Sequence, residues 1–599
     1  MASPSSDSSA ALSLAYNSFL NGKISEMEQI LSGFSADSFS HLDDSLSFQV
    51  LSCHILFHKG FYDQCLQCAN TLLSSCQNHS NSLPLLNLFF IFIELFEQTS
   101  RISDSYRFID KCDKLLHSSS NLDTTEFTQK EGWLQFFRGR LAWWQGSFDS
   151  ALSFFESSLS FSQQIHNDHD IGVSLQNIGL IKFQQSDFSS GIQLHEQALQ
   201  IFKSLDNKYR IAWCLQNLAV AYSDQGRFEQ ALSYNFESLK LRQEIGHINQ
   251  IAWSYSNIGE TYTDLGNFSL ALEYFHKCLS LKDQISSKIL IINVNLATAS
   301  IYRQQGYLDK SFSYLNDAKD LYDPSISKTF LIGILYQFAM TYWMKSDTST
   351  TINNFEEILS LASESDSILP ILTRSSIYFW MIMISLEIKN VDHSNKYLLL
   401  LKDLLASTID SLLIPKIRQN LSLAEALILK TSSRMRDKVQ AQDLFNNIVN
   451  DTSYMSSYRE LAMINLCELL LDELRLFGDP SVLDEVQSLL TKMFSLAESR
   501  DSFSLMTNAL LLQSKLALLN GNVFRCEELL EQAYLITADK DLLMLHKKVA
   551  SEKQHLQDQY ESWKNLVDSH SSFGDRLEQV QLTNYLQEAK KFITIGKLD

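Results

Sequence analysis

Apolar and polar residues follow a helical spacing along most of the chain, and one short motif recurs every 40 residues. The motif opens with a turn residue, has an aromatic residue or leucine two positions later, and has a small residue five positions later. Several copies in one register indicate an internal repeat, which decides the architecture before any other signal. The copies are GSFDSAL at 146–152, SDFSSGI at 186–192, GRFEQAL at 226–232, GNFSLAL at 266–272 and GYLDKSF at 306–312.

A second small residue stands seven positions before each turn and keeps the same period. In four units an aromatic residue follows it three positions later. Spacings of three, four and seven place side chains on one face of an α-helix. Each unit is therefore predicted to be a helix, a short turn and a second helix that packs back on the first. The small residues are Gly139, Gly179, Ala219, Gly259, Ala299 and Ala339, and the aromatic residues are Tyr222, Tyr262, Tyr302 and Tyr342.

This pattern resembles the tetratricopeptide repeat, in the variety with about 40 residues per unit that Pins-type adaptors, kinesin light chains and multi-repeat prokaryotic proteins contain. The small residues, the aromatic residues and the turn residue stand where that family places them. The resemblance implies an all-α fold, a right-handed superhelical solenoid of helix-turn-helix repeats. The tryptophan usual in the first helix of the family is replaced by Leu175, Leu215 and Tyr255.

The period weakens on both sides of the clear repeats, which gives four predicted segments. Residues 1–126 are predicted to form divergent helical pairs, 127–363 the clear repeat block, 364–540 further divergent pairs, and 541–599 capping helices near 541–567 and 575–594. A polar cap is what the end of a solenoid requires. The apolar run Leu83–Phe96 is too short to span a bilayer and is predicted to be a buried helix.

Composition and charge exclude several classes of function. Glycine (19) and proline (6) are scarce in 599 residues, which argues against a fold of strands and tight turns. A formal net charge of −20 without a basic cluster argues against nucleic-acid binding and membrane insertion. Nine cysteines suit a reducing compartment. With no secretory or lipidation signal recognised, we expect a cytoplasmic location.

The first helix of each unit lines the concave groove of such a solenoid. When the small residue is numbered eight, the resemblance implies that positions 2, 5, 6, 9, 12 and 13 face this groove. Asn177, Asn217 and Asn257 all occupy position six. An amide can hold both the N–H and the C=O of an extended peptide, and the resemblance implies such contacts. The alternative is that these asparagines bond within the helix layer.

Further candidates surround this asparagine ladder. Trp213 and Trp253, both at position two, are candidate anchors for apolar side chains, or else they pack between units. The acidic residues Asp224, Glu260 and Asp264 favour a ligand with a basic residue. The alternative is that they form an ordinary solvated surface. Position five carries no lysine, so the carboxylate clamp of chaperone-binding relatives is not expected. The remaining candidate residues for peptide binding are Gln216, Glu260, Asp264 and Arg303, with Asp224 adding to the acidic wall.

Metal and catalytic signals are weak. Cys53 and Cys65 fall at core positions of their repeat, so they are predicted to be small buried side chains, although His54, Cys68 and Cys76 lie nearby. His166 and His169 lie in a connecting loop without further ligands in sequence. No phosphate-binding, dinucleotide-binding or hydrolase motif occurs. No catalytic residue, metal or cofactor is predicted.

These observations predict a non-enzymatic scaffold or adaptor that captures an extended or helical segment of a protein or peptide partner between about residues 170 and 305. The alternative is a ligand-sensing regulator that responds to a signal peptide and lacks a DNA-binding domain of its own. A metalloprotein or enzyme is the third alternative.

Overall fold

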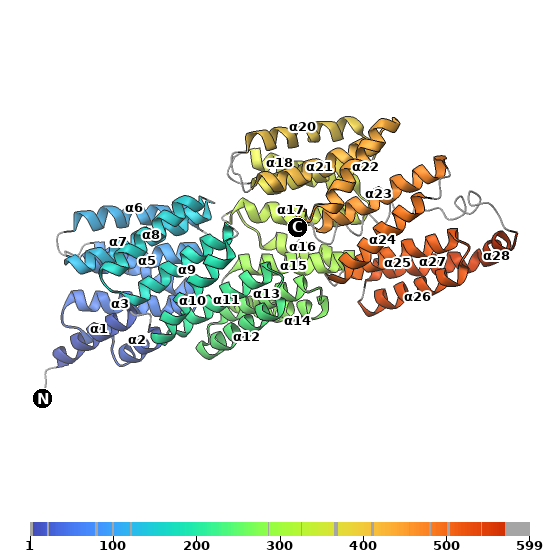
Figure 1. Cartoon of the computed structure of the whole chain (residues 1–599). Coiled ribbons are helices and arrows are strands. Elements are labelled where there is room, and N and C mark those ends of the chain that lie inside the picture. Colours follow the sequence, from blue (N-terminus) through green and yellow to red (C-terminus); the bar gives the residue numbers. More distant parts are fainter. Residues whose placement is uncertain are drawn as a thin grey trace. The chain divides into compact units, whose positions relative to one another are not determined.

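A computed structural model describes the fold of most of the chain (Figure 1). In the part that it describes, the regular elements are helices and no strand occurs. None of these helices is both long enough and apolar enough to cross a membrane. The described residues are 4–20, 23–77, 82–98, 101–119, 122–145, 147–185, 187–285, 287–324, 326–363, 369–408, 413–454, 456–477, 481–499, 503–540 and 542–569.

The helices form two compact units. The N-terminal unit comprises residues 1–294 and 320–327, and the C-terminal unit comprises 295–319 and 328–599. The first helices along the chain are α1 (Pro4–Leu20), α2 (Ile24–Leu31), α3 (Leu42–His58), α4 (Tyr62–Gln77), α5 (Ser82–Gln98), α6 (Ile102–Ser118), α7 (Thr124–Trp144), α8 (Phe148–Gln164), α9 (Asp168–Gln184), α10 (Phe188–Ser204), α11 (Lys208–Asp224), α12 (Phe228–Ile245), α13 (Ile248–Asp264) and α14 (Phe268–Leu279), with short 3-10 turns at Ala36–Ser38 and Lys282–Gln284.

The division between the units falls within α15, inside the predicted block 127–363. The later helices are α15 (Lys288–Gln305), α16 (Leu308–Leu321), α17 (Lys328–Met344), α18 (Thr348–Ser363), α19 (Ile371–Glu387), α20 (Val391–Ser407), α21 (Ile414–Lys430), α22 (Met435–Asn450), α23 (Ser456–Phe477), α24 (Val482–Ser499), α25 (Phe503–Leu519), α26 (Val523–Asp539), α27 (Leu543–Asp558) and α28 (Tyr560–Asp568).

Local capping explains why the helices of the repeat block begin and end in register. The side chains of Asn167 and Asn207 accept hydrogen bonds from the backbone N–H groups of Asp170 (3.0 Å) and Arg210 (3.1 Å), which cap α9 and α11. The turn residue Gly226 has a φ of 74°, a left-handed conformation that ends α11 without a steric penalty. The predicted solenoid of helix-turn-helix repeats is therefore confirmed.

The small residues allow the two helices of a repeat to approach closely. A Cβ atom placed on Gly259 would lie 2.5 Å from the ring of Phe275, and one on Gly139 would lie 2.7 Å from the ring of Phe155. Both rings are buried in the core. In these two repeats a ring of the second helix therefore occupies the space that a side chain of the first would need.

Two further predictions have clear outcomes. The run Leu83–Phe96 lies within α5 and is largely buried, as predicted for a core helix. The predicted helix near 541–567 is instead divided into α27 and α28 at Gln559, because its ψ of 5° departs from the helical value. The cap predicted near 575–594 and the turn residues at 146 and 186 lie outside the described residues.

We expect Gly259→Ala to destabilise the protein by up to about 2 kcal/mol. Overpacking against Phe275 costs about 1–3 kcal/mol and outweighs the roughly 1 kcal/mol gained from alanine's helix propensity. Urea unfolding followed by circular dichroism measures the change. Gly333→Ala is the control, because its Cβ would lie 3.7 Å from Leu296, an ordinary contact. The interpretation fails if Gly259→Ala is as stable as wild type, or if adding Phe275→Leu to it does not restore part of the lost free energy of unfolding.

Candidate functional site

Position nine of the repeat is exposed on α11 and α13, and position thirteen is exposed on α9, α11 and α13. Val220 on α11 is 46% exposed, Glu260 on α13 is also exposed, and Leu180 on α9 is half-buried. An apolar and an acidic side chain thus stand on neighbouring first helices at the same repeat position.

The asparagine ladder lies deeper than this accessible line. Asn177 donates a hydrogen bond from Nδ2 to the carbonyl of Val173 in its own helix, at 2.8 Å. Asn217 and Asn257 are only 7% and 9% exposed, and neither Nδ2 atom has a partner among the described residues. A ligand would reach these two amides only after neighbouring side chains move.

An arginine that the sequence reasoning missed occupies the space beside the predicted tryptophan anchor. Arg242, on α12, is 1% exposed, and its guanidinium lies 5.7 Å from the ring centroid of the half-buried Trp213. It donates hydrogen bonds to Gln216 Oε1, to Ser254 Oγ (2.8 Å) and to the carbonyl of Gln250 (3.1 Å). Burial lowers the pKa of Arg242 to about 10.

This arginine changes the role of the candidate residue Gln216. Because Gln216 accepts a hydrogen bond from Arg242, its side chain joins α11 to α12. Phe202, 40 residues earlier, is also fully buried, so the repeat phase would have placed residue 242 in the core. Trp253 is half-buried, like Trp213.

Glu260 and Asp224 are exposed to solvent, and the surrounding protein nevertheless removes part of their hydration. Desolvation raises the pKa of Glu260 to about 7, although a hydrogen bond from Ser256 Oγ (3.2 Å) opposes the shift, and it also raises the pKa of Asp224. Asp264 accepts a hydrogen bond from Ser223 Oγ at 3.2 Å, which links α11 to α13. Exposure combined with desolvation is typical of a concave surface.

Arg303 belongs to the C-terminal unit, is fully buried, and donates a hydrogen bond to Ser300 Oγ at 3.1 Å.

The turn between α3 and α4 contacts the repeat block, about 190 residues further along the chain. The carbonyl of Gly60 accepts a hydrogen bond from Asn249 Nδ2 at 3.1 Å. A Cβ atom on Gly60 would lie 2.6 Å from that nitrogen and 2.8 Å from the ring of His247. The ring of His58 also meets the edge of Tyr209, with centroids 5.4 Å apart. We call these contacts the α3–α4 closure.

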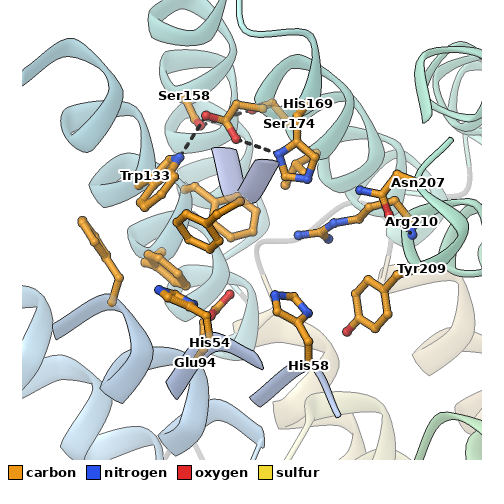
Figure 2. Close-up of a pocket in the computed structure, with 16 residues that line it drawn as sticks. His54, His58, Glu94, Trp133, Ser158, His169, Ser174, Asn207, Tyr209 and Arg210 are labelled. Atoms are coloured by element: carbon orange, nitrogen blue, oxygen red, sulfur yellow. Dashed lines mark hydrogen bonds and ion pairs between the residues drawn. The ribbon is translucent and has the colours of Figure 1, made fainter. Parts of the chain in front are cut away.

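A hollow lies beside the α3–α4 closure, within the N-terminal unit (Figure 2). Its volume is about 90 Å³. Side chains from α1, α3, α5, α7, α8, α9 and α11 line it, so that helical pairs distant in sequence share one cavity. Its aromatic wall consists of Phe19, Phe90, Trp133, Phe136, Phe137 and Tyr209, and its polar groups include His54, His58, Glu94, His169, Asp170, Asn207 and Arg210.

Enclosure by protein changes the charge of several polar groups in this hollow. Burial lowers the pKa of His58 to about 3, with a smaller contribution from nearby cations, and it lowers the pKa of His54 well below the usual value. Both rings are therefore neutral at physiological pH. Burial raises the pKa of Glu94 to about 7, against the opposing effect of Arg210.

The candidate metal ligands serve the core instead. Cys53 and Cys65 are fully buried, Cys68 Sγ lies 3.1 Å from Cys53 Sγ, and Cys65 Sγ lies 3.1 Å from the carbonyl of Cys53. Among the residues that the structure describes, no three His, Cys, Asp or Glu side chains gather as a metal ion requires. The side chain of Cys76 lies outside the described part, and His169 instead contacts Asp170.

The sequence model of the tetratricopeptide repeat matches residues 132–204, 173–244 and 210–284. Residues 132–284 are therefore tetratricopeptide repeats, as the pattern predicts. A comparison with curated protein sequences finds no match.

Several solved structures are similar in fold. A Rap protein complexed with competence and sporulation factor is 13% identical, with a TM-score of 0.43, over 64% of this chain and 99% of its own. The apo quorum sensor NprR from B. thuringiensis is 16% identical, with a TM-score of 0.42, over 61% and 99%. A tetratricopeptide repeat protein from Parabacteroides merdae is 15% identical, with a TM-score of 0.33, over 49% and 99%.

We expect Gly60→Ala to loosen the α3–α4 closure. The added Cβ meets Asn249 and His247, and a φ of 81° adds backbone strain of about 1–2 kcal/mol. Hydrogen–deuterium exchange at the start of α13 should therefore increase. Gly226→Ala is the matched control, because its φ is 74° but nothing lies within 4 Å of its Cβ. Equal exchange at α13 in the two variants would contradict a role for this contact.

Proposed function

We propose that the protein is a non-catalytic scaffold or adaptor, and that first helices α9, α11 and α13 bind an extended segment of a protein or peptide partner. The observation that carries this proposal is the pairing of exposed Val220 with exposed but desolvated Glu260 on neighbouring helices. Val220 on α11 and Glu260 on α13 occupy the same repeat position, so a partner meets an apolar anchor on one first helix and a charged anchor on the next.

The charges favour a basic segment. Glu260 and Asp224 both lose hydration to the surrounding protein, and Asp264 lies close enough to raise the pKa of Glu260 further. A lysine or arginine beside Glu260 would remove this mutual repulsion. Charge at such a surface contributes to specificity and to the rate of association more than to raw affinity.

The buried amides support a second, deeper contact. Asn217 and Asn257 each hold a donor without a described partner, and an enclosed donor without an acceptor costs about 1–3 kcal/mol. A peptide carbonyl that entered between α11 and α13 would satisfy such a donor. A sensor that changes shape on binding a signal peptide is the second candidate function, since reaching these amides requires side chains to move.

We expect Glu260→Gln with Asp264→Asn to reduce the preference for basic peptides by roughly twofold to thirtyfold, as two exposed ion pairs contribute about 0.2–1 kcal/mol each. An array of eight-residue peptides graded by lysine and arginine content measures that preference. Glu229→Gln, on the second helix α12, is the matched control for loss of an exposed carboxylate. If both proteins lose the preference equally, the groove does not provide it.

The same array should show a specific pH dependence. Glu260 is mostly protonated below its pKa of about 7 and ionised above it, so binding of basic peptides should strengthen from pH 6 to pH 8. Glu260→Gln should remove this rise. A rise that persists in the variant would assign the titration to another group.

Asn217→Ala with Asn257→Ala tests the deeper contact. If both amides bind ligand backbone, affinity for the best array peptide should fall by about fivefold to a hundredfold, because each hydrogen bond contributes about 0.5–1.5 kcal/mol. Asn177→Ala should have a smaller effect, since that amide already bonds to Val173. Unchanged affinity with unchanged helicity would assign the ladder to the helix layer.

A further inference from the structure

The hollow beside the α3–α4 closure contains a cation without a counter-ion. Figure 2 shows the Arg210 side chain reaching from α11 into the space between His58 and His169. The recorded contact of its guanidinium is with the ring of Tyr209, at 5.9 Å. Within the described part of the chain, this guanidinium makes no hydrogen bond and no ion pair.

The two carboxyl groups in the hollow leave Arg210 unpaired. Asp170 Oδ2 accepts a hydrogen bond from Trp133 Nε1 at 2.9 Å, and Oδ1 lies 3.0 Å from His169 Nδ1, so both oxygens are engaged. Glu94 forms no ion pair with Arg210 in the described structure, although the charge of Arg210 acts on it, and burial still raises its pKa to about 7, so it is half-protonated at neutral pH. It therefore repels an anion less than an ordinary carboxylate does.

An unpartnered donor group also lines the hollow. His54 is 3% exposed, and neither ring nitrogen has a partner in the described structure. A neutral imidazole always has one N–H to donate. A buried polar group without a partner is unfavourable unless something occupies the space beside it.

We propose that this hollow binds a small aromatic carboxylate, with its charge on Arg210, a hydrogen bond from His54, and its ring among Phe90, Trp133 and Phe137. A guanidinium presents donors in a planar fork that fits both carboxylate oxygens. Aromatic walls favour a ring by edge-to-face or stacked contact.

The size of the hollow sets the size of the ligand. A water molecule needs about 10–15 Å³ of such volume, so about 90 Å³ accommodates roughly six to nine non-hydrogen atoms. Benzoate is of this size.

Titration calorimetry on the full chain tests the site with benzoate, benzamide and benzylammonium as probes. We expect benzoate to bind at one site per chain, and benzamide and benzylammonium to bind at least tenfold more weakly. Equal binding of benzamide, preferred binding of benzylammonium, or no binding of benzoate would overturn the proposal.

Variants assign the binding to Arg210. Arg210→Gln should weaken benzoate roughly tenfold to a hundredfold, the value expected for hydrogen bonds to a charged group. Arg210→Lys keeps the charge without the planar fork and should weaken it several-fold, which provides the decisive comparison if the glutamine variant does not fold. Arg227→Gln, whose guanidinium stacks on Tyr222, should leave benzoate binding unchanged. Unchanged affinity in either Arg210 variant would overturn the assignment.

This site does not depend on the proposed peptide groove. Arg210 and His54 line the hollow, and Glu260 lies outside its lining. Loss of array binding with intact benzoate binding would count against the groove alone, and the reverse result would count against the hollow alone.

Discussion

The close approach of two helices within each repeat is the constraint on which the rest of the fold depends. Where Gly139 or Gly259 stands on the first helix, a phenylalanine ring of the second helix takes the place of a Cβ atom. Where Ala219 stands, the corresponding residue of the second helix is Asn235, which is smaller and also buried. A close-packed interior tolerates such pairs only when the two volumes are matched.

This contact also decides which side chains face outward. The next residue along an α-helix is rotated by about 100°, so when position eight faces the second helix, position nine points away from it. The exposure of Val220 and Glu260 follows from this geometry. The repeats, the turns of the repeat block and the buried Cys53 and Cys65 could be predicted because all of them depend on local periodicity. The candidate status of the acidic residues Glu260 and Asp264 could be predicted for the same reason.

Three features could not be predicted from periodicity. Phase assigns a face to each residue, but the number of repeats in one turn of the superhelix depends on small rotations that add up along the stack. The contact of Gly60 with Asn249, and the hollow lined by α3, α5, α7, α9 and α11, depend on that sum. Arg242 also breaks the pattern, since a cation replaces Phe202 at one core position and bonds only to neutral groups.

The closure and the hollow are built from the same two segments. Helix α3 supplies His54 and His58 to the hollow, and its turn supplies Gly60 to the closure. The start of α11 supplies Tyr209 and Arg210, and the same rigid helix carries Val220 farther along. Any molecule that binds the closed arrangement more tightly than an open one must stabilise the closure by that difference in affinity.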